Sequence, residues 1–124
     1  MNSDQLRNRT KQFALRVIKL AAAMPHTRAG DVLGRQILRS GTSIGANYRE
    51  ALRASSRRHF TTTLEIAIRE ADETLYWLEL LGESGIVKPS RLSDLSRECD
   101  ELIAILTATV VSTKRQLKTA NPKS

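Results

Sequence analysis

The sequence predicts an all-α fold, an antiparallel up-down-up-down four-helix bundle. Its composition favours helix, because Ala, Leu, Arg and Glu are abundant and only 4% of the residues are aromatic. Pro25, Pro89 and Pro122 fall between or beyond four segments of apolar periodicity and interrupt none of them. Short turns join the four segments, so they must pack as antiparallel neighbours. With 124 residues, 40% of them hydrophobic, the chain is expected to form a single domain over residues 1–124.

The first two helices are expected over residues 4–24 and 28–55. Apolar residues recur in each at spacings of three, four and seven, which places them on one face of a helix. Thr27 or Asp31 is a suitable N-cap for the second helix, and a Ser-Ser pair marks its break. The two core stripes are Leu6, Phe13, Val17, Leu20 and Met24, and then Leu33, Ile37, Ser40, Ile44, Asn47 and Ala51.

The third and fourth helices are expected over residues 58–82 and 89–118. A Gly-Glu-Ser-Gly stretch ends the third, and Pro89 suits the first turn of the fourth. Their stripes are Phe60, Leu64, Ala67, Ala71, Thr74, Leu78 and Leu81, and then Leu92, Leu95, Cys99, Leu102, Leu106, Val110, Thr113 and Leu117. The predicted core of the bundle comprises Phe13, Val17, Ile37, Ile44, Leu64, Ala67, Leu78, Leu102 and Leu106.

Two glycines, Gly41 and Gly45, lie about one turn apart inside the second predicted helix. Each costs about 1 kcal/mol relative to alanine, so the pair needs a structural reason. Together with Tyr48 they form a stripe beside the core stripe, where small residues let another helix approach closely. Apolar residues outside the core stripes, including Trp77, exceed what a small monomer usually exposes. We therefore expect a homo-oligomer with Gly41, Gly45, Tyr48 and Trp77 at its interface.

Two longer stretches, LGRQILRSGTSIGANYREALRA and HFTTTLEIAIREADETLYWLELL, resemble a bacterial four-helix bundle family that includes proteins encoded in intervening sequences of 23S ribosomal RNA genes. The motif is carried by Gln36, Arg39, Ser40, Thr42, Ser43, Ile44, Ala46 and Asn47. The resemblance implies a homopentamer without an assigned enzymatic activity. A more distant similarity is to the accessory variability protein of diversity-generating retroelements, which associates with a reverse transcriptase and nucleic acid. Ala51 stands where the family often has glycine, so the second helix is expected to extend further here.

Charge is distributed unevenly along the chain. Residues 1–58 carry twelve basic and three acidic side chains, whereas residues 59–88 carry two basic and six acidic ones. Arginine suits phosphate binding, because its planar fork donates two hydrogen bonds at once. The pattern therefore predicts phosphate contacts to RNA or DNA without sequence specificity. The predicted nucleic-acid-binding residues are Arg28, Arg35, Arg39, Arg49 and Arg53 on the second helix and Arg9, Arg16 and Lys19 on the first.

Two other interpretations of these arginines stay open. They form a solvated face, or they pair with carboxylates of the third helix within one subunit or between subunits. The candidate partners are Glu65, Glu70, Glu73 and Glu79.

Little in the sequence indicates catalysis. No histidine follows a glutamate by three positions, so a di-iron bundle site is not expected, nor is any other metal site or cofactor. Cys99 lies on a core stripe, which favours packing over a nucleophilic role. Arg53 and His59 are separated by five residues, a weak resemblance to ribonucleases of the HEPN type, in which such a pair handles phosphate charge and proton transfer.

The predicted function is a non-enzymatic, oligomeric bundle protein of the cytoplasm that binds nucleic acid. One cysteine cannot form an internal disulfide, and no apolar run reaches the roughly 18 residues of a membrane span. The alternative function is an oligomeric scaffold or accessory protein for a protein partner such as a nucleic-acid enzyme. The ribonuclease is a weaker alternative. The predicted partners are thus other copies of the chain, RNA or DNA, and a further protein.

Overall fold

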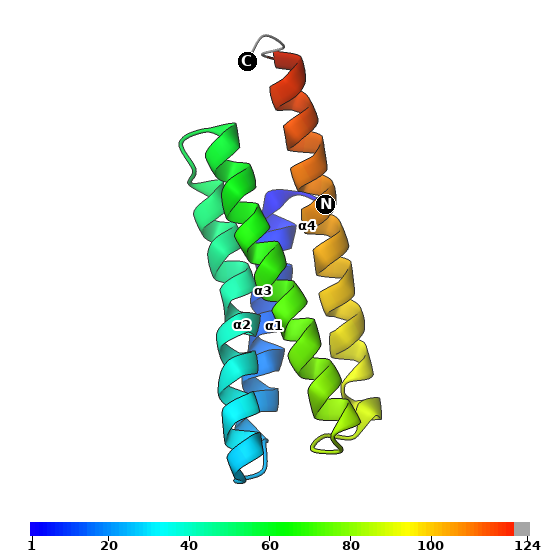
Figure 1. Ribbon diagram of the computed structural model, residues 1–124. Helices are drawn as coiled ribbons and strands as arrows, with labels where there is room; N and C mark the ends of the chain where they lie inside the picture. Colours follow the sequence, from blue (N-terminus) through cyan, green and yellow to red (C-terminus); the bar gives the residue numbers. More distant parts are fainter. Residues whose placement is uncertain (121–124) are drawn as a thin grey trace.

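The computed structural model describes residues 1–120, in which four antiparallel helices follow one another and no strand occurs. The elements are α1 (Ser3–Ala22), α2 (Arg28–Leu52), α3 (Arg57–Glu83), a 3₁₀ turn η1 (Pro89–Arg91) and α4 (Ser93–Ala120). Helix α2 packs against α1 and α3, and α3 also packs against α4, whereas α1 and α4 meet over a shorter stretch (Figure 1). The predicted four-helix bundle is confirmed. None of the described helices has the length and apolar character of a membrane span.

Side-chain caps explain where three of the helices begin. Asn2 and Gln5 cap α1 reciprocally, each side-chain oxygen accepting from the other residue's backbone N–H at 2.8 and 2.9 Å. Thr27, one of the two predicted caps, accepts from a backbone N–H of the first turn of α2 at 3.0 Å. Ser56 does the same for α3 at 3.0 Å. A capping side chain close in the sequence therefore marks the start of each of these three helices.

Two predicted helix boundaries are wrong. Helix α2 ends at Leu52 rather than near residue 55. The N–H groups of Arg53 and Ala54 donate to the carbonyls three residues earlier at 3.0 Å. This tighter 3₁₀-type pattern ends the helix and begins the turn before Ser56. Pro89 begins the 3₁₀ turn instead of α4.

The predicted core is buried at every position, because the 3.6-residue period assigns these side chains to the inner face of each helix. Polar groups in it are satisfied. The hydroxyl oxygens of Ser40 and Thr74 lie 2.8 Å apart and join α2 to α3. The hydroxyls of Thr42 and Ser43 donate to carbonyls four residues earlier, as expected. Asn47 is half-buried, and its amide donates to the Ser43 carbonyl at 2.8 Å.

The glycines of α2 form a seam with α1 inside the protomer. A Cβ on Gly41 would lie 2.8 Å from both methyl groups of Val17, and one on Gly45 would lie 3.1 Å from the Thr10 hydroxyl. Because α1 already covers Gly41 and Gly45, and Tyr48 is buried, their assignment to an interface between subunits is wrong. The close approach that glycine permits is used within one chain.

Candidate nucleic-acid interface

The outward side of α2 carries the exposed arginines that the sequence predicted. Arg28, Arg35, Arg49 and Arg53 are exposed, and none forms an ion pair with another residue of the described chain. They recur along the helix because positions near multiples of seven share one face. These four guanidinium groups are available to a phosphate.

Arg39 is the exception on α2, because carboxylates of α3 engage it. Its Nη1 lies 3.2 Å from an oxygen of Glu70, and its Nη2 donates to Glu73. The hydrogen bond from Arg39 holds the pKa of Glu73 below its usual value. The prediction that Arg39 is a phosphate ligand is therefore replaced by its alternative, an ion pair within one subunit. The contact fixes α2 against α3.

Arg9 performs the same task between α1 and α4. Its Nε and Nη2 each donate to one oxygen of Glu98 at 2.7 Å, and Nη2 also contacts Glu101. This bidentate hydrogen bond lowers the pKa of Glu98 and raises that of Arg9. Arg9 is thus a structural residue rather than a free cation. The other two predicted residues of α1, Arg16 and Lys19, are exposed and have no carboxylate within ion-pair distance in the described chain.

Lys11 is a further basic residue of this surface that was not predicted from the sequence. Lys11 of α1 lines a shallow hollow together with Arg49 of α2, and small residues including Gly45 form its floor. The antiparallel register sets Lys11 beside α2, since its neighbour Thr10 packs on Gly45. The periodicity of one helix does not tell how α1 is aligned with α2. No signal in the sequence therefore indicated that Lys11 lies beside Arg49.

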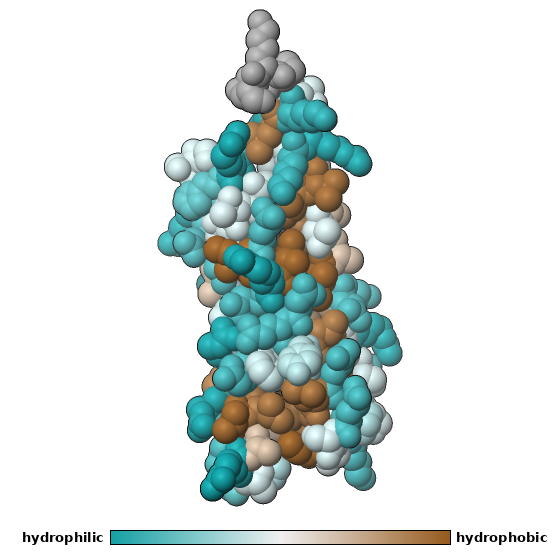
Figure 2. Space-filling view, viewed as in Figure 1, coloured by the Kyte–Doolittle hydropathy of each residue, from teal (hydrophilic) through white to brown (hydrophobic). Residues whose placement is uncertain are grey.

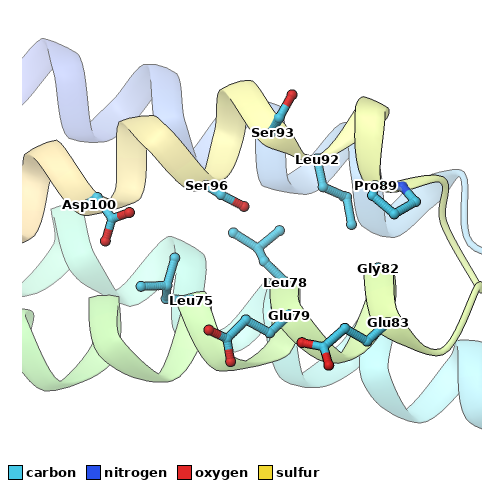
Figure 3. A pocket seen from close by; sticks show the side chains of 10 residues that line it. All are labelled: Leu75, Leu78, Glu79, Gly82, Glu83, Pro89, Leu92, Ser93, Ser96 and Asp100. Atoms are coloured by element: carbon cyan, nitrogen blue, oxygen red, sulfur yellow. The ribbon is translucent and has the colours of Figure 1, made fainter.

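The opposite charge gathers in a hollow of about 340 Å³ between α3 and α4 (Figure 3). Leu75 and Leu78 of α3, together with Pro89 and Leu92 of the connection to α4, give it an apolar lining. Glu79 and Glu83 stand on its α3 side and Asp100 on its α4 side. These three carboxylates have no ion-pair partner among residues 1–120. The hollow is suited to a cationic group with an apolar stem.

The structure also places the residues that were considered for nucleophilic, metal or ribonuclease chemistry. Cys99 donates its thiol to the Ala71 carbonyl at 3.2 Å, and burial raises its pKa to about 12, so it is a buried thiol and not a nucleophile. No cluster of His, Cys, Asp or Glu in the described part of the chain is able to hold a metal ion. Arg53 and His59 are both exposed at the turn between α2 and α3.

Comparison with known proteins agrees with this architecture. A family model described as 23S rRNA-intervening sequence protein matches residues 4–108. The chain is also similar to a crystal structure of a protein of unknown function from the S23 ribosomal protein family of Bacteroides thetaiotaomicron. The two share 37% identity with a TM-score of 0.80, over 85% of this chain and 97% of that chain. No curated protein matched.

Proposed function

We propose that this chain, which belongs to the family of 23S rRNA-intervening sequence proteins, binds RNA or DNA through backbone phosphates and has no enzymatic role. The observation that supports the proposal is the row of exposed, unpaired arginines on α2. From Arg28 to Arg53 this row spans about 38 Å at 1.5 Å per residue, enough to follow several consecutive phosphates. Lys11 adds a charge beside Arg49 from the neighbouring helix.

The proposed binding is independent of base sequence and favours duplexes. Proteins that hold single strands usually stack bases on exposed aromatic rings. Tyr76, the one aromatic side chain of the described residues that is more than half exposed, lies on α3 and not on the basic face of α2. Contacts to phosphates alone suit a duplex, whose backbone is regular and densely charged.

Self-association is the second part of the proposal, and the family resemblance gives five as the expected number of subunits. Leu15 and Ile18 are each 44% exposed and Leu38 is 38% exposed. Trp77, the remaining predicted interface residue, is half-buried. Figure 2 adds apolar side chains in the middle and near the lower end of the face it displays. Light scattering is expected to give a multiple of the 13.8 kDa chain mass, and a monomer mass at micromolar concentration would contradict it.

The alternative function, a scaffold or accessory protein for a protein partner, would use the same apolar surface. A scaffold differs from a nucleic-acid-binding protein in one respect, because it does not need exposed arginines that are free to bind phosphate. Nucleic-acid binding therefore separates the two functions.

The experiment is a titration of labelled single- and double-stranded RNA and DNA, about 20 residues or base pairs long, at about 50 and about 200 mM salt. Arg35→Gln/Arg49→Gln is compared with Lys88→Gln/Arg91→Gln, which removes the same charge from exposed residues of the connection between α3 and α4, at the end of the bundle opposite the turn from α2 into α3. The first variant is expected to weaken binding about tenfold for every sequence, the control less than about twofold. No retention of any probe at about 50 mM salt would leave the scaffold as the better account.

The same samples test the ribonuclease alternative. RNA is expected to stay intact during incubation with the protein. Cleavage by the parent chain that His59→Ala abolishes would overturn the non-enzymatic assignment.

A further inference from the structure

One end of the bundle is poor in acidic side chains. No carboxylate occurs between Glu50 and Glu65 or after Glu101. Figure 1 places both stretches at one end, where the chain turns from α2 into α3 and where the last turns of α4 lie. We call this surface the basic end and define it by its exposed cations, Arg53, Arg57, Arg58, Arg115 and Lys118.

Two helices far apart in the sequence contribute cations to one hollow at this end. Arg57, in the first turn of α3, and Arg115, near the end of α4, line it together with uncharged polar residues of α4. Neither arginine has a carboxylate within ion-pair distance in the described chain. Glu65, the next carboxylate of α3, contacts Lys114 at 3.6 Å. Among residues 1–120, the hollow thus collects positive charge without a compensating carboxylate.

The charges of α3 run against its own dipole. The start of a helix favours acidic side chains and its end favours basic ones, each effect contributing about 0.3–1 kcal/mol. Helix α3 begins with Arg57 and Arg58 and has Glu79 and Glu83 in its last turns. A sequence selected for helix stability alone would have the opposite order. Violations of a local rule of this kind are expected where a surface serves binding.

We propose that the phosphate-binding surface continues from α2 onto the basic end, where its five cations hold a second stretch of nucleic-acid backbone. This inference rests on the proposed function and extends it from Arg53, the last residue of the α2 row, to four cations outside that row. A nucleic acid fits better than a membrane, because Ser112, Gln116 and Thr119 around the hollow offer polar rather than apolar contacts. The attraction is electrostatic, so each phosphate contact releases counterions.

The test compares Arg57→Gln/Arg115→Gln with the Arg35→Gln/Arg49→Gln and Lys88→Gln/Arg91→Gln variants. Binding of a duplex RNA of about 20 base pairs is measured from about 50 to 200 mM salt. The basic-end variant is expected to bind about fivefold to twentyfold more weakly at the low salt, and its salt slope is expected to fall by about 1.8, or 0.9 per lost contact. Circular dichroism is expected to give an unchanged or higher melting temperature.

The outcomes separate this inference from the function on which it rests. If the basic-end variant binds like the far-end control while Arg35→Gln/Arg49→Gln is weakened, the inference is wrong and the function stands. If the parent chain retains no duplex, the function itself fails. Flotation with vesicles of phosphatidylserine and phosphatidylcholine is expected to leave the protein unbound. Vesicle binding that depends on Arg57 and Arg115, with duplex binding unaffected, would reassign the surface to membranes.

Discussion

Two hollows of the bundle carry opposite charge, one at the basic end and one between the end of α3 and the start of α4. At the basic end, Arg57 and Arg115 share a hollow without a carboxylate. At the other, Glu79, Glu83 and Asp100 surround an apolar hollow without a cation. The fold thus adds to the uneven charge of the chain, because it brings Arg57 of α3 beside Arg115 of α4 and Asp100 of α4 beside Glu79 of α3. Arg9 and Arg39 hold helices together through ion pairs, whereas Arg57 and Arg115 have no ion-pair partner among residues 1–120.

The largest expected effect comes from reversing charge at the basic end. Arg53→Glu/Arg57→Glu/Arg115→Glu lowers the net charge from +7 to +1 and places repulsive groups where phosphates are expected. Affinity for duplex RNA at about 50 mM salt is expected to fall at least about 100-fold in a titration. The matched control reverses Arg69, Lys88 and Arg91, reaches the same net charge, and is expected to bind at least about tenfold more tightly than the basic-end variant. Equal losses would mean that net charge alone governs binding.

The next effect separates structural arginines from binding ones. Arg9→Gln leaves Glu98 half-buried without its bidentate partner and is expected to lower the free energy of unfolding by about 1–2 kcal/mol, between the values for exposed and buried pairs. Urea unfolding measures it. Duplex affinity at a temperature where the variant is folded is expected to stay within about twofold. A stability unchanged within about 0.3 kcal/mol would show that the α1–α4 ion pair contributes nothing.

The ion pairs also predict a pH dependence. Arg9 and Arg39 lower the pKa values of Glu98 and Glu73 in the folded protein, so these carboxylates bind protons more weakly folded than unfolded. Their contribution to stability is complete above the ordinary carboxyl pKa of about 4.5 and is lost as the pH falls through the lowered folded values. Melting temperatures between about pH 7 and pH 2 are expected to fall less steeply for Glu98→Gln than for the parent chain. Parallel curves would contradict this.

Substitution of Arg58 is expected to raise the stability of the fold and to weaken duplex binding. Arg58→Glu puts a carboxylate in the first turn of α3, where the dipole favours it, and is expected to stabilise the fold by about 0.3–1 kcal/mol. The same change is expected to weaken duplex binding. Thermal melts and a titration measure the two quantities, with Arg69→Glu in the middle of α3 as the control. Destabilisation at Arg58 would mean that this arginine has a structural role.

The smallest change in stability and affinity is expected at the hollow between α3 and α4, where Glu79 and Glu83 lie. Glu79→Gln/Glu83→Gln removes two carboxylates from the last turns of α3 and is expected to stabilise the fold by no more than about 0.5 kcal/mol. Duplex affinity is expected to rise by no more than about twofold, because these residues lie at the end of the bundle opposite the basic end. If the acidic hollow receives a neighbouring subunit, the variant is expected to shift light scattering towards smaller species. An unchanged mass would exclude these carboxylates from self-association.

The helices and core were predictable because burial on one face follows a fixed period, as for Val17 and Ile44. The caps at Thr27 and Ser56 are equally local. Contacts between helices were not predictable to the same degree. Arg9 and Glu98 are 89 residues apart, and their pairing depends on how α1 and α4 are set against each other. The glycine seam was correctly expected to admit a helix, but its register with α1, and with it the role of Lys11, required the structure.

Phosphate binding by the exposed arginines is expected to protect them from chemical modification. The protein is treated with phenylglyoxal with and without saturating duplex RNA at low salt, and each modified arginine is located by mass spectrometry. Duplex is expected to protect Arg35, Arg49, Arg53, Arg57 and Arg115, while Arg91 in the turn η1 reacts equally in both samples. Protection of Arg91 as strong as that of Arg57, or no protection at any arginine, would contradict phosphate binding at one end of the bundle.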